Sequence, residues 1–390
     1  MPDVRSRLVM TCAILATVAV ATGSCGTTHR PAPPTGATRI TVSVDQCGTG
    51  WSRPTPGQQH FVLADTDTRA GEVLLTDAAS GAVYADVEPV APGTTTDLAI
   101  ALGSGRYAFR CAMEDEATVV GPTVTVPGTV PRPAAPIPPV TQADLIGATR
   151  AYQKYVRDQI PELVRLTAVL AEAINRGDLA DARRAWLPAH LRYERLGAAY
   201  DAFGDLDAEI NGLPNGLPAG VHDPDWAGFH RIEYGLWHAA PAASLRAPAA
   251  ALLTAVRGLG AAFAAAQIAP LDLSIRAHEI TENALQFELT GQGDFGSHTN
   301  LDTVRANLDG TATALTIIRP LLTGRDRALG SLTAALTRAT EDLDALAGPG
   351  GEPPLATLAT RDRERVNADV SELTEQLAPV ASILEPRREA

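Results

Sequence analysis

A proline-rich segment at residues 127–139 divides this 390-residue chain into two stretches with different hydrophobic periods. Its prolines lack amide donors and fix the backbone angle φ, which excludes a continuous helix or an inner strand there. Before the segment, polar and apolar residues alternate, whereas after it apolar residues recur at helical spacing. The sequence therefore predicts a semi-rigid linker at residues 127–140 between a β-domain and a helical domain.

Residues 38–126 are predicted to form a β-sandwich. The first run, at residues 38–44, alternates polar and apolar side chains, and six further β-rich runs follow it, separated by turns rich in Gly, Pro and Ser. About seven short strands in ~90 residues are typical of two packed sheets. Cys47 follows the first run and Cys111 ends the sixth, so a disulfide between them could join the sheets.

The segment around Cys111 is similar to the loop that precedes the last strand of a cupredoxin. A blue-copper site needs two histidines beside the cysteine. No His follows Cys111 in that loop, and the domain has only His60 elsewhere, so no type-1 copper is expected. The disulfide with Cys47 is the favoured interpretation. The alternative is a non-blue metal site that uses Cys111, Met113, Glu114 or Glu72.

Residues 141–390 are predicted to form an all-α bundle. Thr141 and Asp144 have the spacing of a capping box, and long runs rich in Ala, Leu, Arg and Glu follow them. Pro161 and Pro188 are expected to kink or interrupt their helices. The expected helices cover residues 142–175, 178–203, 226–237, 245–266, 273–289, 301–322, 326–346 and 361–384.

The first 24 residues are predicted to be a secretory signal peptide. Two arginines precede an apolar run at residues 8–21, and small residues then lead to Cys25. The run is too short to span a bilayer permanently. Cys25 is therefore expected to become the lipidated first residue of the mature chain, with residues 25–37 as a tether. The alternative is an ordinary signal that is cut nearby and leaves a free exported protein.

Charge and cysteine usage agree with an exported protein that does not bind nucleic acid. The net charge of −13 leaves nothing to offset phosphate repulsion. Cys12 lies in the predicted signal and Cys25 at the lipid site, which leaves Cys47 and Cys111 for one disulfide in an oxidising compartment.

Side chains that could bind a metal concentrate in three places of the helical domain. They are His190 and Glu194 with Asp201, Asp205, Asp207 and Glu209; His230 and Glu233; and His278, Glu279 and Glu282 with Asp294 and His298. On a helix His230 and Glu233 share one face about a turn apart, so both can reach one ion or exchange a proton. Nitrogen and carboxylate donors without thiols favour iron, copper, zinc or manganese. Each cluster alone could equally be a solvated charged face.

Catalytic motifs are weak. The chain contains no H-E-x-x-H, G-x-S-x-G or Walker sequence. His230 and Glu233 could form a carboxypeptidase-like zinc site with His278 or His298, but no general base is recognisable. We therefore expect no enzymatic activity.

Several motifs resemble the EfeO/EfeM family of components of EfeUOB-type iron-uptake systems. The strongest is Gly-Phe-His-Arg-Ile-Glu at residues 228–233, placed after an export signal, a cupredoxin-like domain and a Pro-rich linker. Tyr-Glu-Arg-Leu at residues 193–196 and Asp-Leu-Asp at residues 205–207 are similar to family segments, as are Ser-His-Thr at residues 297–299 and Ile-Arg-Pro-Leu at residues 318–321.

The resemblance implies a cupredoxin-like β-sandwich followed by an imelysin-like, two-part helical bundle. It implies an extracytoplasmic iron-binding protein that is lipid-anchored to the membrane and passes iron to an EfeU-like permease, with an EfeB-like haem peroxidase as a further partner. Iron is the expected metal, with copper or zinc as substitutes in vitro. The implied ligands are His230, Glu233, Glu194 and Glu282, with Asp207 and Glu279 nearby.

This chain departs from the family pattern at two positions. Gly197 stands where the family often has a second Glu, and Asn211 stands where it has an Asp. The site is therefore expected to be reorganised, weaker or differently selective. Two other functions stay open: an imelysin-type metallopeptidase with zinc at His230 and Glu233, and a surface lipoprotein whose acidic clusters are merely solvated.

Overall fold

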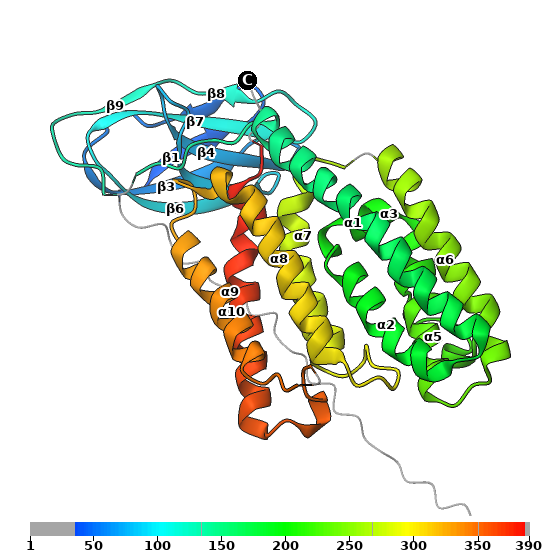
Figure 1. Ribbon diagram of the computed structural model, residues 1–390. Coiled ribbons are helices and arrows are strands. Elements are labelled where there is room, and N and C mark those ends of the chain that lie inside the picture. The colour runs from blue at the N-terminus through cyan, green and yellow to red at the C-terminus, as the bar shows by residue number, and fades with distance from the viewer. Residues whose placement is uncertain (1–35, 134, 267, 350, 387–390) are drawn as a thin grey trace, which may run out of the picture.

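The computed structural model describes residues 36–133, 135–266, 268–349 and 351–386. The predicted signal peptide, the lipid site at Cys25 and nearly all of the predicted tether lie outside the described residues. Within them a β-domain precedes a helical domain (Figure 1), which confirms the predicted fold class.

The β-domain consists of two sheets that share one core. The first has the strand order β2-β1-β3-β6, in which β1 and β3 are parallel, and the second has the order β5-β4-β7-β8, with β9 also paired to β7. Ile40 and Phe61 from the first sheet pack in one core with Leu75 and Phe109 from the second. The strands are β1 Thr38–Val42, β2 Cys47–Thr49, β3 Gly57–Asp65, β4 Gly71–Asp77, β5 Val83–Val90, β6 Thr95–Leu102, β7 Gly105–Met113, β8 Val119–Val120 and β9 Val124–Val126.

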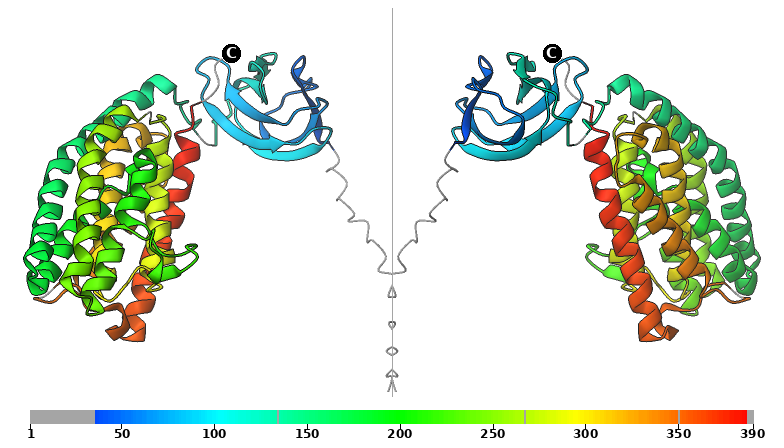
Figure 2. Two further views of the ribbon diagram at one scale, coloured as in Figure 1. Left: turned by 90° about the vertical axis from the view of Figure 1, so that its right-hand side faces the viewer. Right: turned by 90° about the vertical axis from the view of Figure 1, so that its left-hand side faces the viewer.

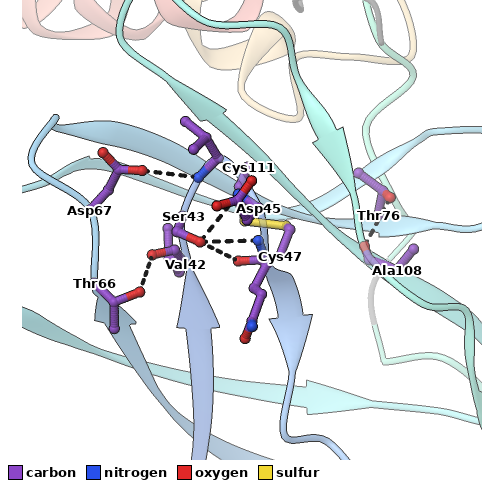
Figure 3. Close-up of a disulfide and its surroundings, with 11 residues drawn as sticks. Val42, Ser43, Asp45, Cys47, Thr66, Asp67, Thr76, Ala108 and Cys111 are labelled. Carbon is purple, nitrogen blue, oxygen red and sulfur yellow. Dashed lines mark hydrogen bonds between the residues drawn. A yellow bond between two sulfur atoms is a disulfide. The ribbon is translucent and has the colours of Figure 1, made fainter.

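A disulfide joins the two sheets (Figure 3). Cys47 at the start of β2 is bonded to Cys111 in β7, with an S–S distance of 2.12 Å. Both residues are buried in the core, where Phe61 and Phe109 meet edge to face at 5.3 Å between ring centroids. Because both sulfurs are bonded to each other, neither is a free thiolate for the alternative metal site at Cys111.

The helices form two groups that meet along α2 and α8 (Figure 1). One group contains α1, α2, α4, α5 and α6, and the other contains α7, α8, α9 and α10. The helices and helical turns are α1 Gln142–Arg176, α2 Leu179–Glu194, η1 Gly197–Ala199, α3 Tyr200–Phe203, α4 Asp205–Asn211, η2 Gly220–His222, α5 Gly228–Trp237, α6 Ala242–Ala265, α7 Asp272–Asn283, η3 Ala284–Glu288, α8 Asn300–Leu322, α9 Leu329–Asp344, η4 Leu355–Thr357 and α10 Thr360–Ile383. In the described part of the chain, α6 alone has the length and hydropathy of a possible membrane span, a test that core helices also pass.

The structure differs from the sequence prediction at one point that matters for function. The single helix expected over residues 178–203 ends at Glu194, and η1 and α3 redirect the chain before the unpredicted helix α4. Gly197 fits this bend because a Cβ there would lie 2.7 Å from a side-chain carbon of Ile280. In contrast, Pro161 and Pro188 do not interrupt their helices. The buried faces of α1 and α2 outweigh the hydrogen bonds that the prolines remove.

The linker at residues 127–140 is attached to both domains. Ile137 pairs with β5, and Arg132 forms a 2.9 Å ion pair with Asp77 of β4. On the helical side, Arg325 donates hydrogen bonds of 3.1 Å to the carbonyls of residues 138 and 139. The β-domain consequently lies at one end of the bundle, beside the C-terminal end of α10 (Figure 2).

Candidate metal site

A cavity of about 780 Å³ lies between the two helical groups. Its walls come from the end of α2, from residues 197–215, and from α5, α7, η3 and α8. The charged and imidazole residues of the wall are Glu194, Asp201, Asp207, His230, Arg276, Glu279 and Glu288. Because carboxylates outnumber the single arginine, the cavity suits a cation.

Glu194 at the end of α2 is held by four hydrogen-bond donors. Its Oε1 lies 3.0 Å from His190 Nε2 and accepts from Asn211 Nδ2 at 2.8 Å. Its Oε2 accepts from Asn307 Nδ2 at 2.8 Å and from the Tyr200 hydroxyl at 3.3 Å. Burial opposes a negative charge here, but hydrogen bonding and the charge of His190 lower the pKa of Glu194 to about 2. Glu194 is therefore ionised.

His190 contacts Glu194 through its Nε2 atom. Burial alone would lower its pKa, but the hydrogen bond and charge of Glu194 raise it. The imidazole stacks on Trp186 with 4.7 Å between ring centroids, and the ring of His230 is 5.1 Å away. Within the described residues the buried Nδ1 has no hydrogen-bond partner. The raised pKa favours the protonated imidazole, and the contact between His190 Nε2 and Glu194 helps to hold the carboxylate.

The first residue of α5, Gly228, places His230 against the neighbouring helix α4. Gly228 has a φ of +88°, and a Cβ there would lie 2.4 Å from the Ile210 carbonyl oxygen, so a larger residue would push the helices apart. His230 Nδ1 lies 3.2 Å from Glu233 Oε2. Since His230 lines the cavity, its Nε2 is the nitrogen available to a cation.

Glu233 orients His230 instead of facing the cavity. Its Oε1 accepts hydrogen bonds from the backbone amides of Phe295 and Ser297 at 3.0 and 3.1 Å, and from the Ser297 hydroxyl at 2.6 Å. Only 1% of its surface is exposed, and it does not line the cavity. A carboxylate that fixes the tautomer and angle of an imidazole is the usual outer partner of a metal-binding histidine.

Glu288 is a site residue that the sequence interpretation missed. It ends a π-helical turn, a feature that is frequent at functional sites. Asn300 Nδ2 donates to its Oε2 at 2.9 Å, and a Cβ on Gly293 would lie 2.1 Å from its Oε1. Burial and the nearby charge of Glu194 raise the pKa of Glu288 to about 8. A bound cation would favour its ionised form.

The predicted ligands differ in whether they line the cavity and in which protein groups already pair with them. Glu194 and His230 lie in the inner part of the cavity wall. Asp207 and Glu279 also line the wall, but Asp207 accepts a hydrogen bond from Tyr193, and Glu279 pairs with Arg276.

Glu282 is not part of the cavity wall. It pairs with His278 at 3.4 Å, and its side chain is 52% exposed. His298 likewise pairs with Asp294 outside the wall. Neither distant histidine joins His230 at the cavity, and Glu233 is fully engaged. The geometry therefore offers no support for the zinc-peptidase alternative.

The residues as they stand do not form a finished coordination sphere. Over residues 36–386, apart from the three single-residue gaps, no group of three or more His, Cys, Asp or Glu side chains is arranged to hold a metal ion. Glu194 and Glu233 both accept hydrogen bonds from donors of the protein itself.

Residues 148–380 match the family model described as imelysin, which carries a peptidase family name. The chain belongs to the imelysin family. It is 26% identical over 351 residues to the iron uptake system component EfeO of Yersinia pestis, covering 89% of this chain and 90% of that protein. For EfeO of Escherichia coli K12 the identity is 25%, covering 89% and 91%. EfeM of Pseudomonas syringae is 30% identical over 204 residues, covering 52% of this chain and 72% of EfeM.

These similarities confirm the resemblance of this imelysin-family chain to the EfeO/EfeM components. The relatives are named iron uptake components, which supports a role in iron uptake. The two EfeO matches extend across both domains, whereas the match to EfeM covers about half of the chain.

Proposed function

We propose that this protein is a lipid-anchored, extracytoplasmic iron-binding component of an EfeUOB-type system, which captures iron and delivers it to a membrane permease. The observation that carries the proposal is the carboxylate-lined cavity into which Glu194, His230 and Glu288 face. The long matches to proteins named as iron uptake components support the choice of iron as cargo.

His230 Nε2 and the carboxylates of Glu194 and Glu288 are the proposed ligands, and Glu233 orients His230. Carboxylate oxygens with a single imidazole suit iron and bind it reversibly, as a carrier requires. Asp207 and Glu279, which also line the cavity, add negative charge that attracts the cation. Glu282 was expected to be a ligand from its position in the sequence, and its location outside the wall makes it a matched control.

Iron titration of purified variants tests this site. His230→Ala, Glu194→Gln and Glu288→Gln are each expected to weaken iron binding at least about tenfold, and Glu233→Gln to do so through loss of orientation. Glu282→Gln should keep the wild-type affinity. Calorimetry with metal analysis of the desalted protein measures both affinity and stoichiometry. Equal iron binding by wild type and His230→Ala would refute the site assignment.

The membrane location and the partners are proposed from the sequence and the family. Lipidation at Cys25 would hold the cavity near a permease, and an EfeB-like haem peroxidase would act beside it. In cells, Cys25→Ala should move the protein from the membrane fraction to the soluble fraction. A variant that stays in the membrane fraction would contradict the lipid anchor, but this result would not bear on the proposed iron site.

A further inference from the structure

We propose that Arg276 is a latch that joins the two walls of the cavity at its outer end and sets how fast the cation enters and leaves. The proposal rests on the proposed iron-binding function and adds a gating residue to it. Arg276 lines the cavity together with Asp201 and Glu279, and we call these three residues the outer cluster. Among the described residues of the wall Arg276 is the one arginine, so its position decides which carboxylates stay free.

The outer cluster lies nearer the solvent than the proposed ligands. The side chains of Asp201, Glu279 and Arg276 are 65%, 36% and 28% exposed. In contrast, the side chains of Glu194 and His230 are 9% and 3% exposed. A cation that comes from solvent and reaches Glu194 and His230 therefore passes the outer cluster.

Arg276 connects parts of the wall that belong to different helical groups. Its Nη1 pairs with Glu279, about one turn farther along α7, and its Nη2 lies 3.2 Å from Asp201 Oδ2 in α3. The helix α3 packs on α4 and α6 of the first group, whereas α7 packs on α8 and α10 of the second. The ion pair between Arg276 and Asp201 thus crosses from one wall to the other and holds them together.

The latch is weak enough to open often. The two carboxylates hold the guanidinium, and within the described residues Arg276 Nε has no hydrogen-bond partner. Ion pairs between exposed side chains rarely change the equilibrium of a contact by more than about fivefold. A latch of this strength slows the passage of a cation without blocking it, which suits a carrier that both loads and releases its cargo.

An incoming cation competes with Arg276 for the same carboxylates. The guanidinium stays positively charged at physiological pH, so a second cation at Asp201 or Glu279 repels it. The approach of the cation frees Arg276 from Asp201, and the walls separate while the cation passes inward. Once the cation has reached the inner ligands, Arg276 pairs with Asp201 again and closes the outer end. Only charged side chains move, and no covalent bond forms or breaks.

Uptake and release rates of Arg276→Lys test the latch. Lysine keeps the positive charge but has no forked head group that could hold two carboxylates at once. Uptake from ferric nitrilotriacetate and release to excess ethylenediaminetetraacetate are followed by stopped-flow tryptophan fluorescence. Both rates are expected to be about two- to fivefold faster than in wild type, with an unchanged affinity.

Arg165→Lys is the matched control. Arg165 also pairs with a glutamate three residues away on its own helix, but it lies outside the cavity wall. This variant should keep both rates of wild type. Faster exchange in Arg165→Lys as well would contradict a role that is specific to the cavity.

Asp201→Asn removes the same contact from the opposite wall. Because the two substitutions break one ion pair, the double variant Asp201→Asn, Arg276→Lys should release iron no faster than the faster single variant. Effects that multiply in the double variant would contradict the bridge.

The outcomes separate the latch from the proposed function. Equal rates in wild type and Arg276→Lys, or slower uptake in Arg276→Lys, would refute the latch and leave the iron-binding function intact. Absence of any iron binding to wild type would refute both. Thermal melting checks that Arg276→Lys folds. If it does not, Asp201→Asn at its exposed position takes its place, and unchanged release of iron by that variant would equally refute the latch.

Discussion

Glu194 and Glu288 lie on the wall of one cavity, yet their surroundings drive them to opposite protonation states. Glu194 has two side-chain amides, a hydroxyl and a buried imidazole around its oxygens, and its pKa is about 2. Glu288 has one amide, from Asn300, and its pKa is about 8. Both carboxyls are buried, so burial alone cannot explain the difference; the number of donors and the sign of the nearest charge do.

The difference gives the cavity an adjustable charge. At neutral pH Glu194 is already ionised, whereas Glu288 mostly keeps its proton and can lose it when a cation arrives. The empty cavity thus avoids placing two uncompensated negative charges side by side. A cavity built in this way avoids like-charge repulsion and still offers both carboxylates to a cation.

Removal of His190 should have the largest effect on this arrangement. His190→Leu leaves the Glu194 charge buried without its cationic neighbour, which costs about 3 kcal/mol of unfolding free energy. The loss should shrink at low pH, because Glu194 would then take up a proton. Urea unfolding at neutral pH and near pH 5 measures both effects.

A matched control exists on α7. His278 and Glu282 have the same residue types and the same four-residue spacing as His190 and Glu194, but they lie at the surface. His278→Leu should cost less than about 1 kcal/mol. A similar cost for the two leucine variants would mean that burial and charge pairing do not distinguish the two pairs.

The pH dependence of stability should reveal Glu288. Its folded pKa of about 8 lies above the ordinary value of 4.5, so between these pH values the unfolded chain loses a proton that the folded protein keeps. The contribution of Glu288 to the free energy of unfolding is therefore complete below pH 4.5. It decreases as the pH rises to about 8, by at most ~1.4 kcal/mol per pH unit. Glu288→Gln should flatten that part of the curve, measured by urea unfolding from pH 5 to 9. An unchanged slope would contradict the assignment.

Sequence reasoning predicted the order of a β-domain and a helical domain, because hydrophobic period is a local pattern, and it proposed His230 as a site residue. It could not show that Glu233 is engaged by the backbone of residues 295–297, since that contact joins distant parts of the chain. The family resemblance implied Glu282 as a ligand, and the sequence interpretation did not consider Glu288. Periodicity tells which residues share a face, but not which face meets another helix, and it cannot foresee a π-turn that rotates Glu288 inward.

Two features near the site did carry a usable signal. His190 and Glu194 are four residues apart, so they lie on one helical face, and the structure pairs them. Glu288 stands between Phe287 and Leu289, as a carboxylate in the apolar end of the helix expected over residues 273–289. The break at Gly197, by contrast, is decided by the fit of that glycine against Ile280, which no local pattern encodes.

The smallest effect expected is electrostatic coupling between the two carboxyls. After burial, the charge of Glu194 is the main reason that the pKa of Glu288 is raised. Glu194→Gln should therefore lower the pKa of Glu288, and the fall in stability with rising pH should end below pH 8. The four-way comparison of wild type, Glu194→Gln, Glu288→Gln and the double variant isolates this coupling. If the fall still ends near pH 8, burial alone sets the protonation of Glu288, and the two carboxyls act independently in the cavity.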